Sequence, residues 1–169
     1  NWRKGESESG YPRYDHYLKP QFVTHYEKFT EFLAKQQITT PVVQQCEVTY
    51  VNHIPRGEAW KTPEDWRRVF TVFGKTSERK FLPKAEGCNF AITYLLPEKQ
   101  GRLRVSVTSV VRTKDGKEVL QFNVAARIKP KGSGVDDLLQ SFDLGREWVV
   151  RGFTDLTTYQ MHQAWEKDL

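Results

Sequence analysis

The sequence predicts an α+β protein, with an antiparallel sheet of about four strands and helices packed on one face of it. Four segments alternate between apolar and polar residues, as strands do when one face is buried. Helical periodicity precedes the first of these segments, and a long helical segment followed by a short one ends the chain. The 169 residues are 38% hydrophobic and 13% aromatic, which is too apolar for a disordered chain and sufficient for a core.

The first part of the chain is predicted as an extended lead over residues 1–19, because it is polar and contains Gly and Ser. It has neither an initiator Met nor the apolar segment of a signal peptide. We therefore expect it to be the remnant of a longer N-terminal part, followed by a single α+β domain over residues 20–169. The first helix is predicted over residues 20–37. Its buried stripe comprises Phe22, Tyr26, Phe29 and Leu33.

The first strand is predicted over residues 42–54, and it places an amide among apolar residues. Asn52 shares a face with Val48, Tyr50 and Ile54, since side chains alternate along a strand. A buried amide without a hydrogen-bond partner costs roughly 1–3 kcal/mol. We expect Asn52 to bond backbone groups of the loop that follows. The alternative is that Asn52 and Tyr50 contact a ligand or a partner.

A second helix is predicted over residues 62–74. Thr62 can cap it, Pro63 suits its first turn, and the two acidic residues that follow favour the positive end of the helix dipole. Its apolar stripe comprises Trp66, Val69, Phe70 and Phe73.

Three strands follow in succession, over residues 88–96, 103–111 and 120–128. Asp115 and Gly116, between the last two strands, are a strong hairpin signal, and a two-residue loop there sets a register. In this register every apolar residue faces another. The predicted pairs include Val111–Leu120, Leu103–Ile128, Arg104–Arg127 and Arg102–Lys129.

The chain is predicted to end with a long helix over residues 135–153 and a shorter one. Gly145 and Gly152 lie on the buried stripe of the long helix, where each glycine costs about 1 kcal/mol relative to alanine. We expect them to let the helix approach the sheet closely. The residues assigned to the last helix are Thr157 and Gln160, with capping-box spacing, and Met161 and Trp165 on the inner face.

The sequence contains no recognisable catalytic or metal-binding motif. The four histidines are scattered without metal-ligand spacing, and there is no phosphate-binding loop or nucleophile elbow. Cys46 and Cys88 lie on apolar strand faces, so we expect small buried thiols in a reducing cytoplasm. No apolar run approaches the roughly 20 residues that cross a bilayer. We therefore expect a cytoplasmic protein that is not an enzyme, with no cofactor, no metal and no membrane contact.

The outward faces of the third and fourth strands are basic. Lys and Arg exceed Asp and Glu by 26 to 21. Such a mild excess indicates a binding surface only if the basic residues are concentrated in one place. Three interpretations stay open: a solvated face with local ion pairs, for example to Glu47; a surface for an acidic protein or for a missing part of this chain; and a nucleic-acid site. The face lacks the exposed aromatic residues that stack on bases. The candidate residues for a partner or an anion are Arg102, Arg104, Arg127, Lys129 and Lys131.

Three stretches share short motifs with known proteins: NWRK followed by YPRY, the strand ending with Tyr50, Val51 and Asn52, and the last helical region FDLGREWVVRGFTDLTTYQMHQAW. Together they resemble a sporadically distributed bacterial family known mainly as hypothetical proteins. The resemblance covers most of the chain and corresponds to the C-terminal portion of a typical member. It implies a bacterial cytoplasmic protein with an additional N-terminal segment, and it implies no activity, cofactor or catalytic residues.

The leading functional hypothesis is a non-enzymatic interaction domain. It would dock through the basic sheet face to another protein, to a second copy or to its own missing N-terminal part. Binding of nucleic acid through the same face is the first alternative. A small-ligand pocket between the long last helix and the sheet, formed by Tyr50, Asn52 and the space at Gly145, is the second alternative.

Overall fold

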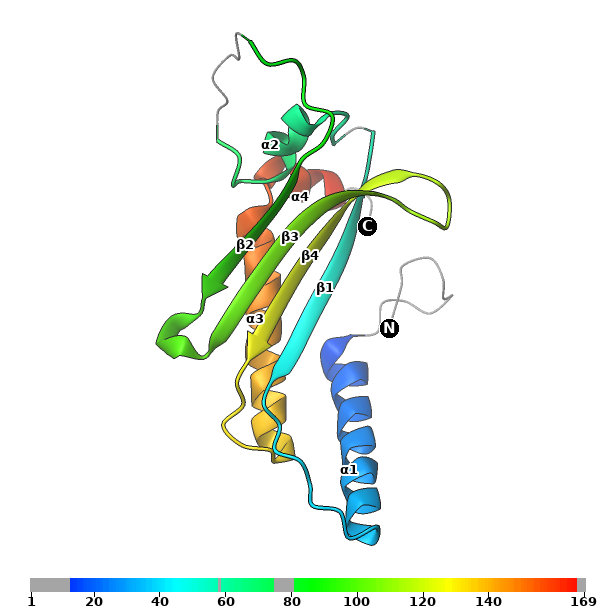
Figure 1. Ribbon diagram of the computed structural model, residues 1–169, viewed down its shortest axis with the longest axis vertical. Helices are drawn as coiled ribbons and strands as arrows, with labels where there is room; N and C mark the ends of the chain where they lie inside the picture. Colours follow the sequence, from blue (N-terminus) through cyan, green and yellow to red (C-terminus); the bar gives the residue numbers. More distant parts are fainter. Residues whose placement is uncertain (1–12, 58, 75–80, 167–169) are drawn as a thin grey trace. The chain divides into compact units, whose positions relative to one another are not determined.

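The computed structural model describes residues 13–57, 59–74 and 81–166 (Figure 1). Most of the predicted lead, residues 1–12, therefore lies outside the described residues. The chain divides into two compact units. The first unit comprises the described residues up to Gln44 together with Pro130–Gln140, and the second comprises Gln45–Lys129 together with the chain from Ser141 onward.

The first unit contains a π-helical turn, Tyr14–Leu18, that continues into helix α1, Lys19–Lys35. The prediction of an extended chain up to residue 19 is wrong for these residues, because the helical backbone begins before Pro20. The Tyr26 hydroxyl donates a hydrogen bond to the Ser133 carbonyl oxygen at 2.7 Å, and the Val43 N–H donates to Ser133 Oγ at 2.8 Å. These bonds join distant parts of the sequence within the unit.

The second unit is built on a four-stranded antiparallel sheet with the strand order β1-β4-β3-β2. Together with helices that include a long one near the C-terminus, this sheet confirms the predicted α+β class. Each strand lies within four residues of its predicted bounds. The strands are β1 Cys46–Pro55, β2 Asn89–Leu95, β3 Gly101–Val111 and β4 Glu118–Ile128.

The predicted register between β3 and β4 is wrong by two residues. Val111 pairs with Glu118, and Arg102 pairs with Arg127. The connection is a four-residue loop over residues 113–116 rather than a two-residue loop, because the Arg112 N–H donates to the Lys117 carbonyl oxygen at 2.8 Å. Since the shift is even, every side chain keeps its predicted face.

Helix α3, Val135–Leu156, spans the region predicted as the long helix, and Figure 1 shows it running along one face of the sheet. Its two glycines permit a close approach. A Cβ atom at Gly145 would lie 3.2 Å from Val48 Cγ2, and one at Gly152 would lie 2.7 Å from Leu103 Cδ2. The predicted role of the two glycines is confirmed.

The helix predicted over residues 62–74 is much shorter. A 3₁₀ turn, Pro63–Asp65, precedes helix α2, Trp66–Val69, and Phe70 is extended, with φ −116° and ψ 136°. Phe70 pairs with Thr157 in an isolated β-bridge and is fully buried, with its ring centroid 5.1 Å from that of Phe122. Packing against other aromatic rings therefore outweighs the helical pattern of the sequence.

The last helix, α4, spans Tyr159–Glu166 and begins one residue later than predicted. The Met161 N–H donates to Thr158 Oγ1 at 3.4 Å, so Thr158 rather than Thr157 caps the helix. The Thr157 hydroxyl instead donates to the Phe153 carbonyl oxygen at 2.7 Å, at the end of α3. Met161 is buried as predicted, and Trp165 packs against the core.

Candidate functional site

The face of the sheet opposite α3 gathers mostly polar and small side chains from all four strands, and we call it the open face. In Figure 1 it is the face turned toward the viewer, with α3 behind it. Alternation places the core residues on the α3 side and these residues on the other side. The open face comprises Glu47, Thr49, Val51 and His53 of β1, Gln121, Asn123, Ala125 and Arg127 of β4, Arg102, Arg104, Ser106 and Thr108 of β3, and Asn89, Ala91, Thr93 and Leu95 of β2.

Three of the five candidate basic residues come together on this face. Arg102 lies directly opposite Arg127, and such like-charged pairs across strands are unfavourable unless they are neutralised. Glu47 lies opposite Arg127 on its other side, and Arg127 Nε donates a hydrogen bond to Glu47 Oε2. The expectation that Glu47 supplies a local ion pair is confirmed for Arg127.

Arg102 and Arg104 differ from Arg127 in their surroundings. Both side chains are exposed, and no carboxylate among the described residues forms an ion pair with either. In the row of Arg104 the neighbours across the strands are Ala125 and Thr93, which are small and uncharged. The surface around Arg104 is therefore low, and both exposed guanidinium groups are accessible to an external anion.

The two lysines of the predicted set lie beyond the strands. Lys129 is exposed and lies one residue beyond the end of β4. Lys131 is also exposed, but it belongs to the first unit rather than to the sheet. The candidate site is therefore Arg102 and Arg104 with Arg127 beside them, and Lys129 follows along the same ladder, where its N–H donates to the Gln100 carbonyl oxygen at 3.1 Å.

Asn52 points to the core side as predicted, opposite Phe122 on β4. Its Nδ2 atom is buried and has no hydrogen-bond partner within the part of the chain that the structure describes. The expectation that this amide bonds the following loop is wrong for its nitrogen. The loop is held instead by Trp60, whose indole N–H donates to the Ile54 carbonyl oxygen at 3.0 Å. Tyr50 packs against the core.

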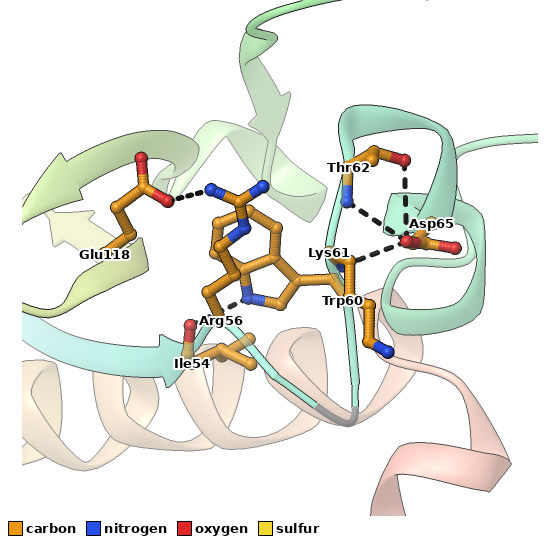
Figure 2. Close-up of polar contacts among 7 residues, drawn as sticks. All are labelled: Ile54, Arg56, Trp60, Lys61, Thr62, Asp65 and Glu118. Carbon is orange, nitrogen blue, oxygen red and sulfur yellow. Dashed lines mark hydrogen bonds and ion pairs between the residues drawn. The ribbon is translucent and has the colours of Figure 1, made fainter.

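A second polar group, which the sequence did not indicate, surrounds Trp60 in the loop after β1 (Figure 2). The Arg56 guanidinium carbon lies 5.9 Å from the centroid of the Trp60 ring, and the same guanidinium forms an ion pair with Glu118 of β4. These contacts fix the loop on the end of the sheet. The one signal in the sequence is a tryptophan at a position that fits neither helical nor strand periodicity.

The turn after Trp60 is held by Asp65, which Figure 2 shows beside Thr62. Asp65 Oδ2 accepts hydrogen bonds from the N–H groups of Lys61 and Thr62 at 2.9 and 3.1 Å. These bonds lower the pKa of the Asp65 carboxyl group. Next to the turn lies a hollow of about 610 Å³. It is lined by Gly57, Trp60, Lys61, Asp65 and Arg68.

Both cysteines are free thiols. Burial raises the pKa of the Cys46 thiol, while a hydrogen bond with Ser141 acts in the opposite direction, and burial also raises the pKa of Cys88. Neither thiol is activated as a nucleophile. Across residues 13–57, 59–74 and 81–166, no group of three His, Cys, Asp or Glu side chains is arranged to hold a metal ion, and no helix is long and apolar enough to cross a membrane.

Comparison with other proteins adds no assignment. No protein-family model, curated protein or solved structure matches this chain.

Proposed function

We propose that this protein is a non-enzymatic interaction module whose open face binds an acidic segment of a protein partner. The observation that carries the proposal is the difference among three neighbouring arginines. Arg127 is neutralised by Glu47, whereas Arg102 and Arg104 are exposed and lack an ion pair with any described carboxylate. Arginine presents a planar set of donors that matches a carboxylate in two-point geometry.

The shape of the face supports a protein partner. Its central positions carry small residues, among them Ala91, Ser106 and Ala125, so a chain can approach the sheet closely beside Arg104. Shape complementarity of this kind gives an interface its specificity, while charge complementarity steers the encounter. In keeping with the resemblance noted in the sequence, we place the protein in the bacterial cytoplasm.

A nucleic-acid partner fits the face less well. Proteins that bind single strands stack bases on aromatic side chains, and His53 is the only aromatic ring among the residues of the open face. Binding to a phosphate backbone requires several cations that release counterions together. The open face offers two arginines that pair with no carboxylate of residues 13–57, 59–74 or 81–166, which gives only a weak electrostatic attraction.

The proposal is tested by reversing the two charges. We expect the Arg102→Glu/Arg104→Glu variant to lose a protein partner that copurifies with the wild type from its native cells. The Lys28→Glu/Lys35→Glu variant changes net charge by the same amount at exposed positions of α1, and it should retain that partner. Equal retention by all three proteins would contradict the proposal.

A parallel measurement separates the nucleic-acid alternative. Labelled single-stranded DNA, double-stranded DNA and RNA are titrated with the wild type and with the Arg102→Glu/Arg104→Glu variant, and fluorescence anisotropy is followed at low and physiological salt. We expect no binding that survives physiological salt, because few phosphates are neutralised. Binding that survives there and disappears in the variant would assign the open face to nucleic acid instead.

A further inference from the structure

Strand β2 is an edge strand that lacks the usual protection against pairing. It bonds to β3 on one side, and no strand among the described residues pairs with its other side. Natural edge strands carry lysines, prolines or bulges that prevent pairing with another chain. The seven residues of β2, NFAITYL, include no charged residue and no proline. The opposite edge strand, β1, contains Glu47 and ends at Pro55.

The last hydrogen bond between β2 and β3 shows which residues of β2 bond to β3 and which point to the free edge. The Leu96 N–H donates to the Gly101 carbonyl oxygen at 3.0 Å, in line with the register of the two strands. Residues of an antiparallel pair alternate between bonded and non-bonded positions. The even-numbered residues of β2 therefore bond to β3. The backbone groups that point to the free edge belong to Asn89, Ala91, Thr93 and Leu95.

We propose that β2 pairs antiparallel with β2 of a second copy, about a two-fold axis at Ile92. This register uses the whole strand and places Phe90 opposite Tyr94 of the second copy. It also places Ala91 opposite Thr93 and Asn89 opposite Leu95. All four residues with outward backbone groups then occupy hydrogen-bonded positions.

The side chains of β2 complement themselves in this arrangement, as a two-fold interface requires. Phe90, Ile92 and Tyr94 all lie on the core side of the sheet, and Tyr94 is 39% exposed in the single chain. They occupy the non-bonded positions of the new pair, where side chains approach most closely. Phe90 then lies opposite Tyr94 of the second copy, and Ile92 lies opposite its own counterpart. No like charges face each other. These features favour a second copy over an unrelated strand.

The pairing has a consequence for the open face. Directly opposite residues of an antiparallel pair share a face, so the open faces of both copies lie on the same side of one continuous sheet. The dimer therefore presents two sets of Arg102 and Arg104 on a single surface. Two sites held at a fixed separation bind a partner with two acidic segments more tightly than either site alone.

The test is the molar mass of the full chain over a concentration series, measured by sedimentation equilibrium. The Ala91→Pro variant removes an N–H that points to the free edge, so it leaves the bonds to β3 intact. Ala91→Thr at the same exposed position keeps the N–H and serves as the matched control. We expect a dimer for the wild type and for Ala91→Thr, and half that mass for Ala91→Pro. A wild type that is monomeric at every concentration, or an Ala91→Pro variant that stays dimeric, would overturn the proposal.

If Ala91→Pro does not fold, amide hydrogen exchange of the wild type tests the same pairing. The amides of Ala91 and Thr93 should gain protection as concentration rises through the dimer transition. A dimer in which these amides exchange as freely as in the monomer would locate the interface elsewhere and reject the β2 pairing. The Arg102→Glu/Arg104→Glu variant should still dimerise, so failure of the proposed function and failure of the dimer are separate results.

Discussion

Asn52 places a buried amide nitrogen without a described partner on the core side of β1. We expect Asn52→Val to raise the free energy of unfolding by about 1 kcal/mol, because the desolvation cost of the amide disappears and a β-branched residue suits a strand. Urea unfolding measures the change. Thr49→Val, at an exposed position of the same strand, should change stability by less than about 0.5 kcal/mol. A clear loss of stability in Asn52→Val would show that the amide has a partner.

The side chain of Asp115 stabilises the loop between β3 and β4. Its Oδ1 atom accepts hydrogen bonds from Arg112 Nε at 2.9 Å and from the Lys117 N–H at 3.3 Å, and the Arg112 guanidinium holds the pKa of the carboxyl at about 2. The folded-state pKa therefore lies below the value of about 3.9 in an unfolded chain. The stability that this carboxylate contributes is present above the unfolded value and is lost as pH falls towards the folded value.

The expected result is a pH-dependent difference between the wild type and Asp115→Asn. The wild type should be the more stable protein near neutral pH, and the difference should shrink between about pH 4 and pH 2 as the carboxyl is protonated. Urea unfolding of both proteins across this range measures it. A difference that stays constant with pH would mean that the charge of Asp115 does not stabilise the hairpin.

At the scale of elements, α2 and the residues after it depend on aromatic packing. The ring of Phe70 is fully buried and lies edge-on to Trp66, Phe73, Phe90 and Phe122. We expect Phe70→Ala to lower the free energy of unfolding by about 3–5 kcal/mol, because the removed ring leaves a cavity. Chemical denaturation measures this loss.

Phe81 provides the control for this prediction, since its side chain is 95% exposed. Phe81→Ala should change stability by less than about 0.5 kcal/mol. If the two variants lose similar amounts of stability, the aromatic cluster around Phe70 does not hold this end of the sheet.

The elements that the sequence predicted well are those whose pattern is local. Alternation placed all four strands and the face of each residue, and helical periodicity placed α1 and α3. The loop between β3 and β4 was predicted two residues too short, because Asp115 bonds to Arg112 and Gly116 adopts a positive φ of 67°. The end of α2 was missed because burial of Phe70 and its bridge to Thr157 are tertiary effects.

At the scale of the whole molecule, the sequence identified the basic face but not which of its arginines forms an ion pair. Alternation alone assigned Arg102, Arg104 and Arg127 to one face. Only the true register shows that Arg127 lies between Glu47 and Arg102, so that one arginine is neutralised while its neighbours pair with no described carboxylate. Lys131 follows β4 closely in sequence but belongs to the other compact unit, so its membership of the same cluster stays a prediction. A single domain over residues 20–169 stays a prediction.

The central claim is that the open face binds a protein through Arg102 and Arg104. Photo-crosslinking from a benzoylphenylalanine at Ser106, in the middle of that face, tests it most directly in the native cells. We expect a discrete protein adduct, linked at an acid-rich segment of the partner, whose yield falls when both arginines are changed to glutamate and persists in Lys28→Glu/Lys35→Glu. The control site is Tyr159, an exposed residue of α4. An adduct yield at Ser106 no greater than that at Tyr159, or one that the arginine variant does not reduce, would contradict the account.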